Sequence, residues 1–132
     1  MGKVWKGRQI GKLRNSNIFK YKSLQGSVNM NGFEKFEELV KEGKYILLFY
    51  ADWCQYCEML KPLLIQILEE KYSEKDLKLV FINIDEFNEI AEKYNVKSLP
   101  TTIFLKSGSE VGRIVGYYTR DELEKKIDGY VK

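Results

Sequence analysis

The cysteine pair Cys54 and Cys57 is the feature that most restricts how this chain can fold. It follows the continuous apolar run 45–50 and opens the segment 54–72, in which apolar residues recur every three or four positions. A short continuous apolar run is typical of a central strand covered on both faces, and the later spacing predicts an amphipathic helix. The two thiols are therefore predicted to lie where a buried strand ends and a helix begins.

A helix N-terminus is a place where sulfur becomes reactive. It carries roughly half a positive charge and unpaired amide donors, and both favour a thiolate over a thiol. The position and spacing of Cys54 and Cys57 thus indicate thiol–disulfide exchange.

Two cysteines and no histidine leave few other uses for the pair. Structural zinc and iron–sulfur sites usually need four such ligands, so one chain supplies too few, although two chains that each lend a pair could share a metal. A purely structural disulfide is a weak alternative, because so small a loop removes little unfolded-state entropy. We expect no metal and no cofactor.

The composition is typical of a globular domain, with 44% hydrophobic and 31% charged residues in a chain of 132. No apolar stretch reaches the roughly 18 residues of a membrane span, and the N-terminus lacks the apolar core of a secretory signal. We expect a cytoplasmic protein; the alternative is an extracytoplasmic one whose signal or anchor is absent from this sequence. Abundant Lys, Glu, Ile and Tyr without His suggest a thermophilic source.

Charge separates the N-terminal segment from the rest. Residues 1–31 hold seven basic side chains and no acid, whereas the remaining residues carry a net charge of −4. We therefore divide the chain into a basic extension, 1–30, and a domain, 31–132. Within residues 4–22, apolar and basic residues alternate loosely around a turn-like Asn-Ser-Asn, which favours a β-hairpin, an edge strand or an arm without fixed structure.

The remaining elements follow from periodicity and turn residues. Helical spacing over 33–40 ends at Gly43, a strand is expected over 77–84, and a short helix over 86–94. Two further strands, 101–105 and 111–115, flank a glycine-containing turn, and Thr119 with Glu122 forms a capping-box signature for a last helix. This order predicts an α/β sandwich with a mixed central β-sheet flanked by helices.

The order of elements and several motifs resemble the thioredoxin family. The resemblance covers residues 31–132 and rests on Ala51-Asp52-Trp53-Cys54, Cys57, Pro62 inside the helix, Asn83-Ile84-Asp85, Ser98-Leu99-Pro100-Thr101, Gly108 and Gly116. It implies a thioredoxin fold, a kink at Pro62, and a cis peptide bond before Pro100 beside the disulfide.

The resemblance also implies roles for individual residues. Cys54 would be the exposed nucleophile and Cys57 the buried resolving thiol. The residues that would contact an extended peptide substrate are Trp53, Gln55, Tyr56, Leu99, Pro100, Val115, Gly116 and Tyr117. Thioredoxin-like proteins take part in electron transport and cell redox homeostasis, so we expect protein disulfides as substrates, a reductase or other electron donor as partner, and a monomer.

Two departures from the family pattern stand out. Leu48 and Phe81 occupy the positions of the usual buried acid and lysine, so water or an exposed acid, Glu58 or Asp52, would have to take the proton of Cys57. The inter-cysteine residues are Gln-Tyr where the family commonly has Gly-Pro. Tyrosine adds no histidine-like charge, so a very strong oxidant is not expected. The Cys-x-Tyr-Cys form also resembles extracytoplasmic reductases.

The sequence thus predicts a reductase of protein disulfides, with two alternatives. One is an oxidase or isomerase that donates its disulfide. The other is a thioredoxin-fold interaction module whose basic arm binds nucleic acid or an acidic partner. A nucleic-acid partner is not expected, because charge runs are usually solvated faces.

Overall fold

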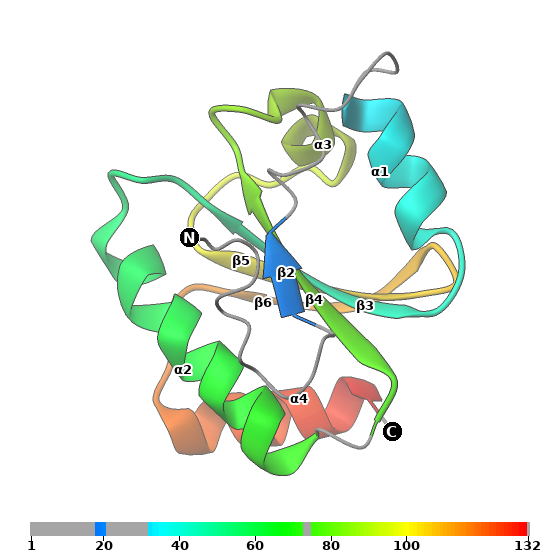
Figure 1. Cartoon of the computed structure of the whole chain (residues 1–132). Helices are drawn as coiled ribbons and strands as arrows, with labels where there is room; N and C mark the ends of the chain where they lie inside the picture. Colours follow the sequence, from blue (N-terminus) through cyan, green and yellow to red (C-terminus); the bar gives the residue numbers. More distant parts are fainter. Residues whose placement is uncertain (1–17, 21–31, 73–74, 132) are drawn as a thin grey trace.

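Figure 1 shows a computed structural model of the chain, which describes residues 18–20, 32–72 and 75–131. The elements, in chain order, are β2 (Ile18–Lys20), α1 (Gly32–Val40), β3 (Lys44–Tyr50), α2 (Gln55–Lys71), β4 (Leu77–Asn83), α3 (Asn88–Lys93), β5 (Thr101–Lys106), β6 (Ser109–Val115) and α4 (Arg120–Val131). The helices and strands expected between residues 33 and 131 are all present. None of the helices in the described part of the chain is long and apolar enough to cross a bilayer.

The strands form one mixed sheet in the order β2-β4-β3-β5-β6. β3 is central and runs parallel to β4 and antiparallel to β5, and β6 completes the hairpin. The mixed sheet confirms the predicted fold class. Ile18–Lys20 pairs in parallel with β4 as an edge strand, one of the forms expected for the N-terminal segment; the rest of the expected hairpin lies outside the described residues.

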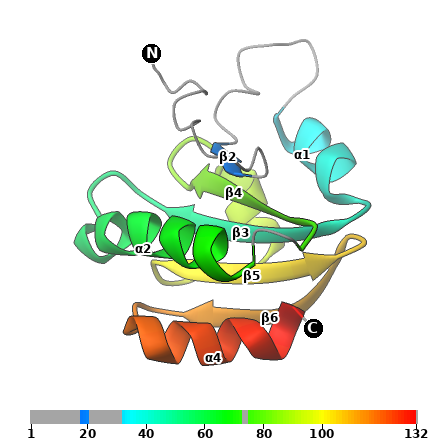
Figure 2. The same ribbon diagram turned by 60° about the horizontal axis from the view of Figure 1, so that its bottom comes forward.

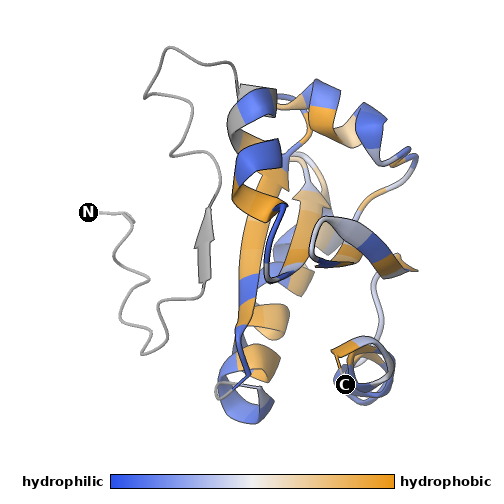
Figure 3. Cartoon of the chain, turned by 90° about the vertical axis from the view of Figure 1, so that its right-hand side faces the viewer, coloured by the Kyte–Doolittle hydropathy of each residue, from blue (hydrophilic) through white to orange (hydrophobic). Residues whose placement is uncertain are grey.

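Helices cover both faces of the sheet, as Figures 1 and 2 show for α2 and α4 on one side and α1 and α3 on the other. Side chains of β3 alternate between the two faces. Ile46 and Leu48 join the core under α2 and α4, whereas Leu47 and Phe49 join the core under α1 and α3. Because both faces are buried, β3 is hydrophobic along almost its whole length, as the orange strands in Figure 3 illustrate.

Local signals set the ends of most elements, with small corrections. The β5–β6 turn is tighter than expected: only Ser107 and Gly108 lie between the strands, both with positive φ, as a type I′ hairpin turn requires. The helix expected over 86–94 is shorter, because the amides of Glu86 and Phe87 bond the carbonyl of Asn83 in a turn. Strand β4 correspondingly ends at Asn83.

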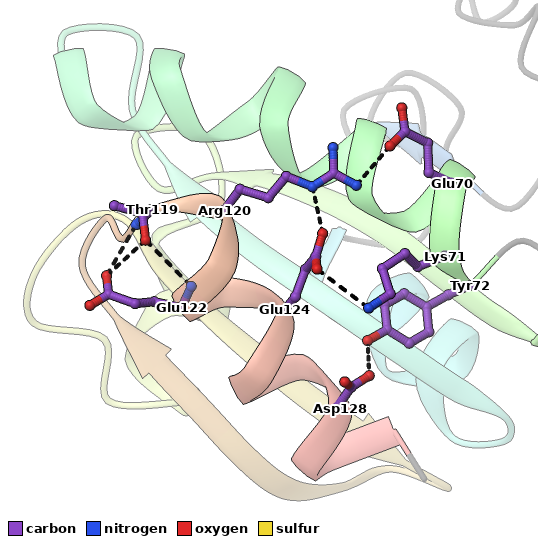
Figure 4. Close-up of polar contacts among 8 residues, drawn as sticks. All are labelled: Glu70, Lys71, Tyr72, Thr119, Arg120, Glu122, Glu124 and Asp128. Atoms are coloured by element: carbon purple, nitrogen blue, oxygen red, sulfur yellow. Dashed lines mark hydrogen bonds and ion pairs between the residues drawn. The ribbon is translucent and has the colours of Figure 1, made fainter.

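Helix α4 begins with the predicted capping box and is fastened to the end of α2 (Figure 4). The Glu122 amide donates to Thr119 Oγ1, and Glu122 Oε1 accepts from the Thr119 amide at 3.3 Å. The contacts between the helices join Arg120 to Glu70 at 2.7 Å, Lys71 to Glu124 at 3.3 Å and the Tyr72 hydroxyl to Asp128. We call these side chains, with the Arg120–Glu124 ion pair, the clamped end of α2.

Candidate active site

Cys54 and Cys57 lie where β3 is followed by α2, as the sequence predicts. β3 ends at Tyr50, and the Cys54 amide bonds the carbonyl of Ala51 at 3.1 Å, which turns the chain into the helix. Cys54 is the N-cap residue of α2, with an extended backbone, and Cys57 stands in the first turn. The two form a disulfide, with their Cα atoms 5.2 Å apart.

The start of α2 places a backbone donor on the Cys54 sulfur. The amide of Cys57 donates to Cys54 Sγ at 3.2 Å, in the manner of an ordinary N-cap side chain. The same dipoles and donors that favour anions at a helix start therefore act on this sulfur. Cys54 is 8% exposed and Cys57 is fully buried, so Cys54 is the more accessible of the two.

Apolar side chains stand exposed around the start of α2. Trp53 is 70% exposed and Tyr56 is 60% exposed. The ring of Tyr56 stacks on that of Tyr117, which lies between β6 and α4, with centroids 5.8 Å apart. Val115 at the end of β6 is also exposed. We call Trp53, Tyr56, Met59, Val115 and Tyr117 the apolar collar.

Met59 is one of the apolar residues whose spacing predicts the amphipathic helix 54–72, yet it does not lie on the buried face of that helix. It is 47% exposed, whereas Leu60 and Leu64 are buried. The buried stripe of α2 is centred on Cys57, Leu60 and Leu64, and each residue advances about 100° around a helix. Met59 therefore falls beyond the edge of that stripe.

Asp85 is a site residue whose role the sequence did not reveal. Its Oδ2 accepts a hydrogen bond from Trp53 Nε1 at 3.1 Å, and its amide donates to Asn83 Oδ1 at 2.8 Å. The available signal was that parallel strands β3 and β4 end at the same edge of the sheet, which brings residues just after each strand together. Trp53 thus has a polar partner on a neighbouring loop.

The loop before β5 forms another side of the site. The Leu99–Pro100 peptide bond is cis, and the carbonyl of Pro100 accepts from the Gly116 amide at 2.8 Å. Leu99 packs against the core cluster that contains both cysteines. Gly116 has φ of +104°, which a residue with a Cβ rarely adopts. The structure therefore brings Pro100 and Gly116 together, as it does Tyr56 and Tyr117, while Gln55 is exposed beside the cysteines.

The positions of the usual buried acid and lysine are filled by packing residues. Leu48 is fully buried and Phe81 is 4% exposed, and they are direct partners across β3 and β4 in the same core cluster as Cys57. Both acids considered from the sequence, Asp52 and Glu58, are exposed. Burial raises the pKa of the neighbouring Tyr50 to about 12, so its hydroxyl is neutral at physiological pH.

Comparison with known proteins agrees with this arrangement. Residues 27–129 match the model of the Thioredoxin family. The thioredoxin of Listeria monocytogenes is 38% identical over 96 residues, which cover 73% of this chain and 91% of that protein. Thioredoxin H2 of Arabidopsis thaliana is 36% identical over 93 residues, or 70% of this chain and 67% of that protein.

Solved structures are similar as well. Thioredoxin NaTrxh from Nicotiana alata superposes with a TM-score of 0.68 at 31% identity, covering 89% of this chain and 96% of that one. Mitochondrial thioredoxin 3 from Saccharomyces cerevisiae gives 0.64 at 32% identity, covering 74% and 89%. Family model, relatives and structures all match the part of the chain that carries the cysteine pair. We conclude that the chain belongs to the thioredoxin family of thiol–disulfide oxidoreductases.

Proposed function

We propose that this protein reduces disulfides in other proteins, with Cys54 as nucleophile and Cys57 as resolving thiol. The observation that carries the proposal is the hydrogen bond from the Cys57 amide to Cys54 Sγ at the N-cap of α2. This contact and the helix dipole favour a thiolate on Cys54 once the pair is reduced. Cys57 has no exposed surface, so an incoming disulfide meets Cys54 first.

The reaction proceeds in two exchanges. The Cys54 thiolate attacks one sulfur of the substrate disulfide; a Cys54–substrate bond forms, and the other substrate sulfur leaves as a thiolate and takes a proton. Cys57 then loses its proton and attacks Cys54 Sγ. The Cys54–Cys57 bond forms, and the second substrate sulfur leaves with a proton. Two electrons have passed from the dithiol to the substrate, and a partner reductase or other electron donor must restore the dithiol.

The apolar collar supports a protein rather than a small molecule as substrate. Trp53, Tyr56 and Val115 each expose about half of their surface or more, and apolar surface of this kind on a single edge marks an interaction site. We propose that Leu99, Pro100, Gln55 and Gly116 complete this contact surface. The Pro100–Gly116 hydrogen bond holds two of these residues together, and Gly116 directly precedes the collar residue Tyr117.

An insulin-type disulfide-reduction assay tests the proposal on the parent, Cys54→Ser and Cys57→Ser. We expect Cys54→Ser to fall to the uncatalysed rate, because the nucleophile is lost. Cys57→Ser should retain the first exchange and accumulate a mixed disulfide with the substrate. A Cys57→Ser protein that turns over as fast as the parent, or a Cys54→Ser protein that still forms mixed disulfides, would contradict the assignment.

The direction of electron flow is tested separately. Equilibration with glutathione buffers gives the reduction potential; a value well above that of thioredoxins would favour the oxidase or isomerase alternative.

The family match begins at residue 27, which supports our proposal that residues 1–30 are an extension to the domain. The proposals of a cytoplasmic location and a monomer stay predictions, to be checked by fractionation and light scattering.

A further inference from the structure

A lysine occupies the region in which strands β3 and β4 lack a charged pair. Leu48 and Phe81 are apolar, yet helix α2 places the ammonium of Lys61 near the ring of Phe81. Its Nζ is 3.9 Å from the centroid of the Tyr50 ring and 5.9 Å from that of Phe81. These two rings touch edge to face, with centroids 6.2 Å apart, and belong to the core cluster of Cys57.

Lys61 is held in this position from two sides. Its side chain is only 17% exposed, and the electron-rich ring faces attract the ammonium. On the opposite side, Glu58 Oε2 lies 3.1 Å from Nζ, one turn back on the same helix. A lysine with such partners keeps little rotamer freedom, so its charge has a defined position.

That position lies on the Cys57 side of α2. Residues four apart on a helix are neighbours on one face, about 5–6 Å apart at their Cβ atoms, and Lys61 follows Cys57 by four. Cys57 faces the sheet, and so does the ammonium that reaches the rings of β3 and β4. Helix α2 therefore places this cation on the same side, toward the sheet, as the resolving thiol.

We propose that Lys61 is a positioning residue for the second exchange: its charge stabilises the Cys57 thiolate that attacks the mixed disulfide. The inference rests on the proposed function and adds the group that replaces the family's buried pair. Burial in an apolar core disfavours a thiolate, and a nearby cation offsets that penalty. Other ionisable groups at this cluster are Tyr50 and Tyr72, which belong to it, and Glu58, Asp52 and Glu86, whose charges act on the Tyr50 hydroxyl.

The step itself is balanced without further reactants. Cys57 releases its proton to water, the thiolate attacks Cys54 Sγ, the internal disulfide forms, and the substrate thiolate departs and takes up a proton. Lys61 exchanges no atom in this step and changes only the fraction of Cys57 that is ionised. The first exchange, by Cys54, does not use it.

Stopped-flow reaction of the reduced protein with excess dithiobis(nitrobenzoate), a chromogenic disulfide, separates the two exchanges. Attack by Cys54 releases one coloured thiolate at a rate proportional to the reagent. Attack by Cys57 releases the second at a rate independent of the reagent. For Lys61→Met we expect the first phase to stay within about twofold, and the second to slow about tenfold at neutral pH. The pH at which the second phase reaches half of its maximal rate should rise by about one unit in Lys61→Met.

Matched variants separate charge from packing. Lys61→Arg should restore the rate and pH midpoint of the second phase, and Lys125→Met, an exposed lysine of α4, should leave both phases unchanged. An unchanged second phase in Lys61→Met would overturn the proposal, as would equal slowing of both phases or failure of arginine to rescue. Glu58→Gln slowing the second phase as much as Lys61→Met would assign the step to Glu58 instead. Absence of the first phase in the parent would contradict the proposed function itself.

Discussion

The two ends of α2 are built in opposite ways. At its start, a sulfur takes the place of a capping oxygen, and the surrounding side chains Trp53 and Tyr56 are largely exposed. At the clamped end, Tyr72 is buried and its hydroxyl bonds Asp128, while Lys71 pairs with α4 (Figure 4). One helix thus offers apolar surface and a reactive group at one end and uses polar side chains for internal contacts at the other.

This difference shows how a small domain keeps a reactive end accessible. Exposed apolar surface around the cysteines costs free energy of folding, because that surface could otherwise be buried. The clamped end and the core below it supply contacts that hold the helix against the sheet and α4. Stability and activity are therefore expected to respond to substitutions at different ends of α2.

The largest expected effect is on stability at the clamped end. Tyr72→Ala removes a buried ring together with the Asp128 hydrogen bond, and should lower the free energy of unfolding by about 3 kcal/mol. Disulfide reduction per folded molecule should stay near the parent value. Urea unfolding and the reduction assay check both numbers. A large loss of specific activity would show that the ends of α2 are not independent.

An alkaline titration compares the two ends through their buried tyrosines. Burial raises the pKa of Tyr50 to about 12, and burial and the Asp128 contact also raise the pKa of Tyr72. A raised folded-state pKa means that stability is fully present below the unfolded value near pH 10 and is lost as pH rises toward the folded value.

We expect the oxidised parent to lose stability above about pH 10, and Tyr50→Phe to lose about 1–2 kcal/mol less than the parent by pH 11.5. Tyr72→Phe should likewise reduce the alkaline loss. Urea unfolding at neutral and alkaline pH measures the difference. Equal alkaline losses in parent and Tyr50→Phe would refute the role of that hydroxyl.

At the cysteine end, the stacked pair should matter more for activity than for stability. Tyr56→Ala and Tyr117→Ala each remove an aromatic contact, so each should lower the free energy of unfolding by about 0.5–1.5 kcal/mol. For a protein disulfide we expect KM to rise about fivefold, with the rate on a small chromogenic disulfide unchanged. A double-mutant cycle should show coupling between the rings; additive losses would mean that they act separately.

The smallest expected effect comes from the exposed ion pairs of the clamped end. Hydrogen bonding to Arg120 and then to Lys71 lowers the pKa of Glu124. Its contribution is therefore present above the unfolded pKa and is lost as pH falls through the folded one. When the pH is lowered, Glu124→Gln should lose only slightly less stability than the parent, because solvent screens exposed ion pairs. Thermal melts between neutral pH and about pH 3 check this; a change as large as that of Tyr72→Ala would contradict it.

Local sequence signals identified the elements and the cysteine pair. The apolar run of β3, the capping box Thr119–Glu122 and the Cys54-x-x-Cys57 spacing each act within a few residues, where backbone geometry limits the outcome. The resemblance to the thioredoxin family also implied that Leu48 and Phe81 replace its buried pair, and the two are partners across β3 and β4.

Contacts between distant residues needed the folded chain. The Trp53–Asp85 hydrogen bond, the Tyr56–Tyr117 stack and the exposure of Met59 depend on how loops approach and on how far α2 is rotated about its axis. Apolar spacing in the sequence places the buried face of a helix only to within about one residue. It therefore does not decide whether a side chain at the edge of that face is buried or exposed.

The sequence alone therefore determined that a dithiol stands at the junction of a buried strand and a helix, since spacing and hydrophobicity specify this locally. Only the tertiary structure decided which charges and rings surround it. The Lys61 ammonium meets Tyr50 and Phe81 because α2 packs over β3 and β4 in one particular rotation. Many side chains pack together to set that rotation, and no short stretch of sequence encodes it.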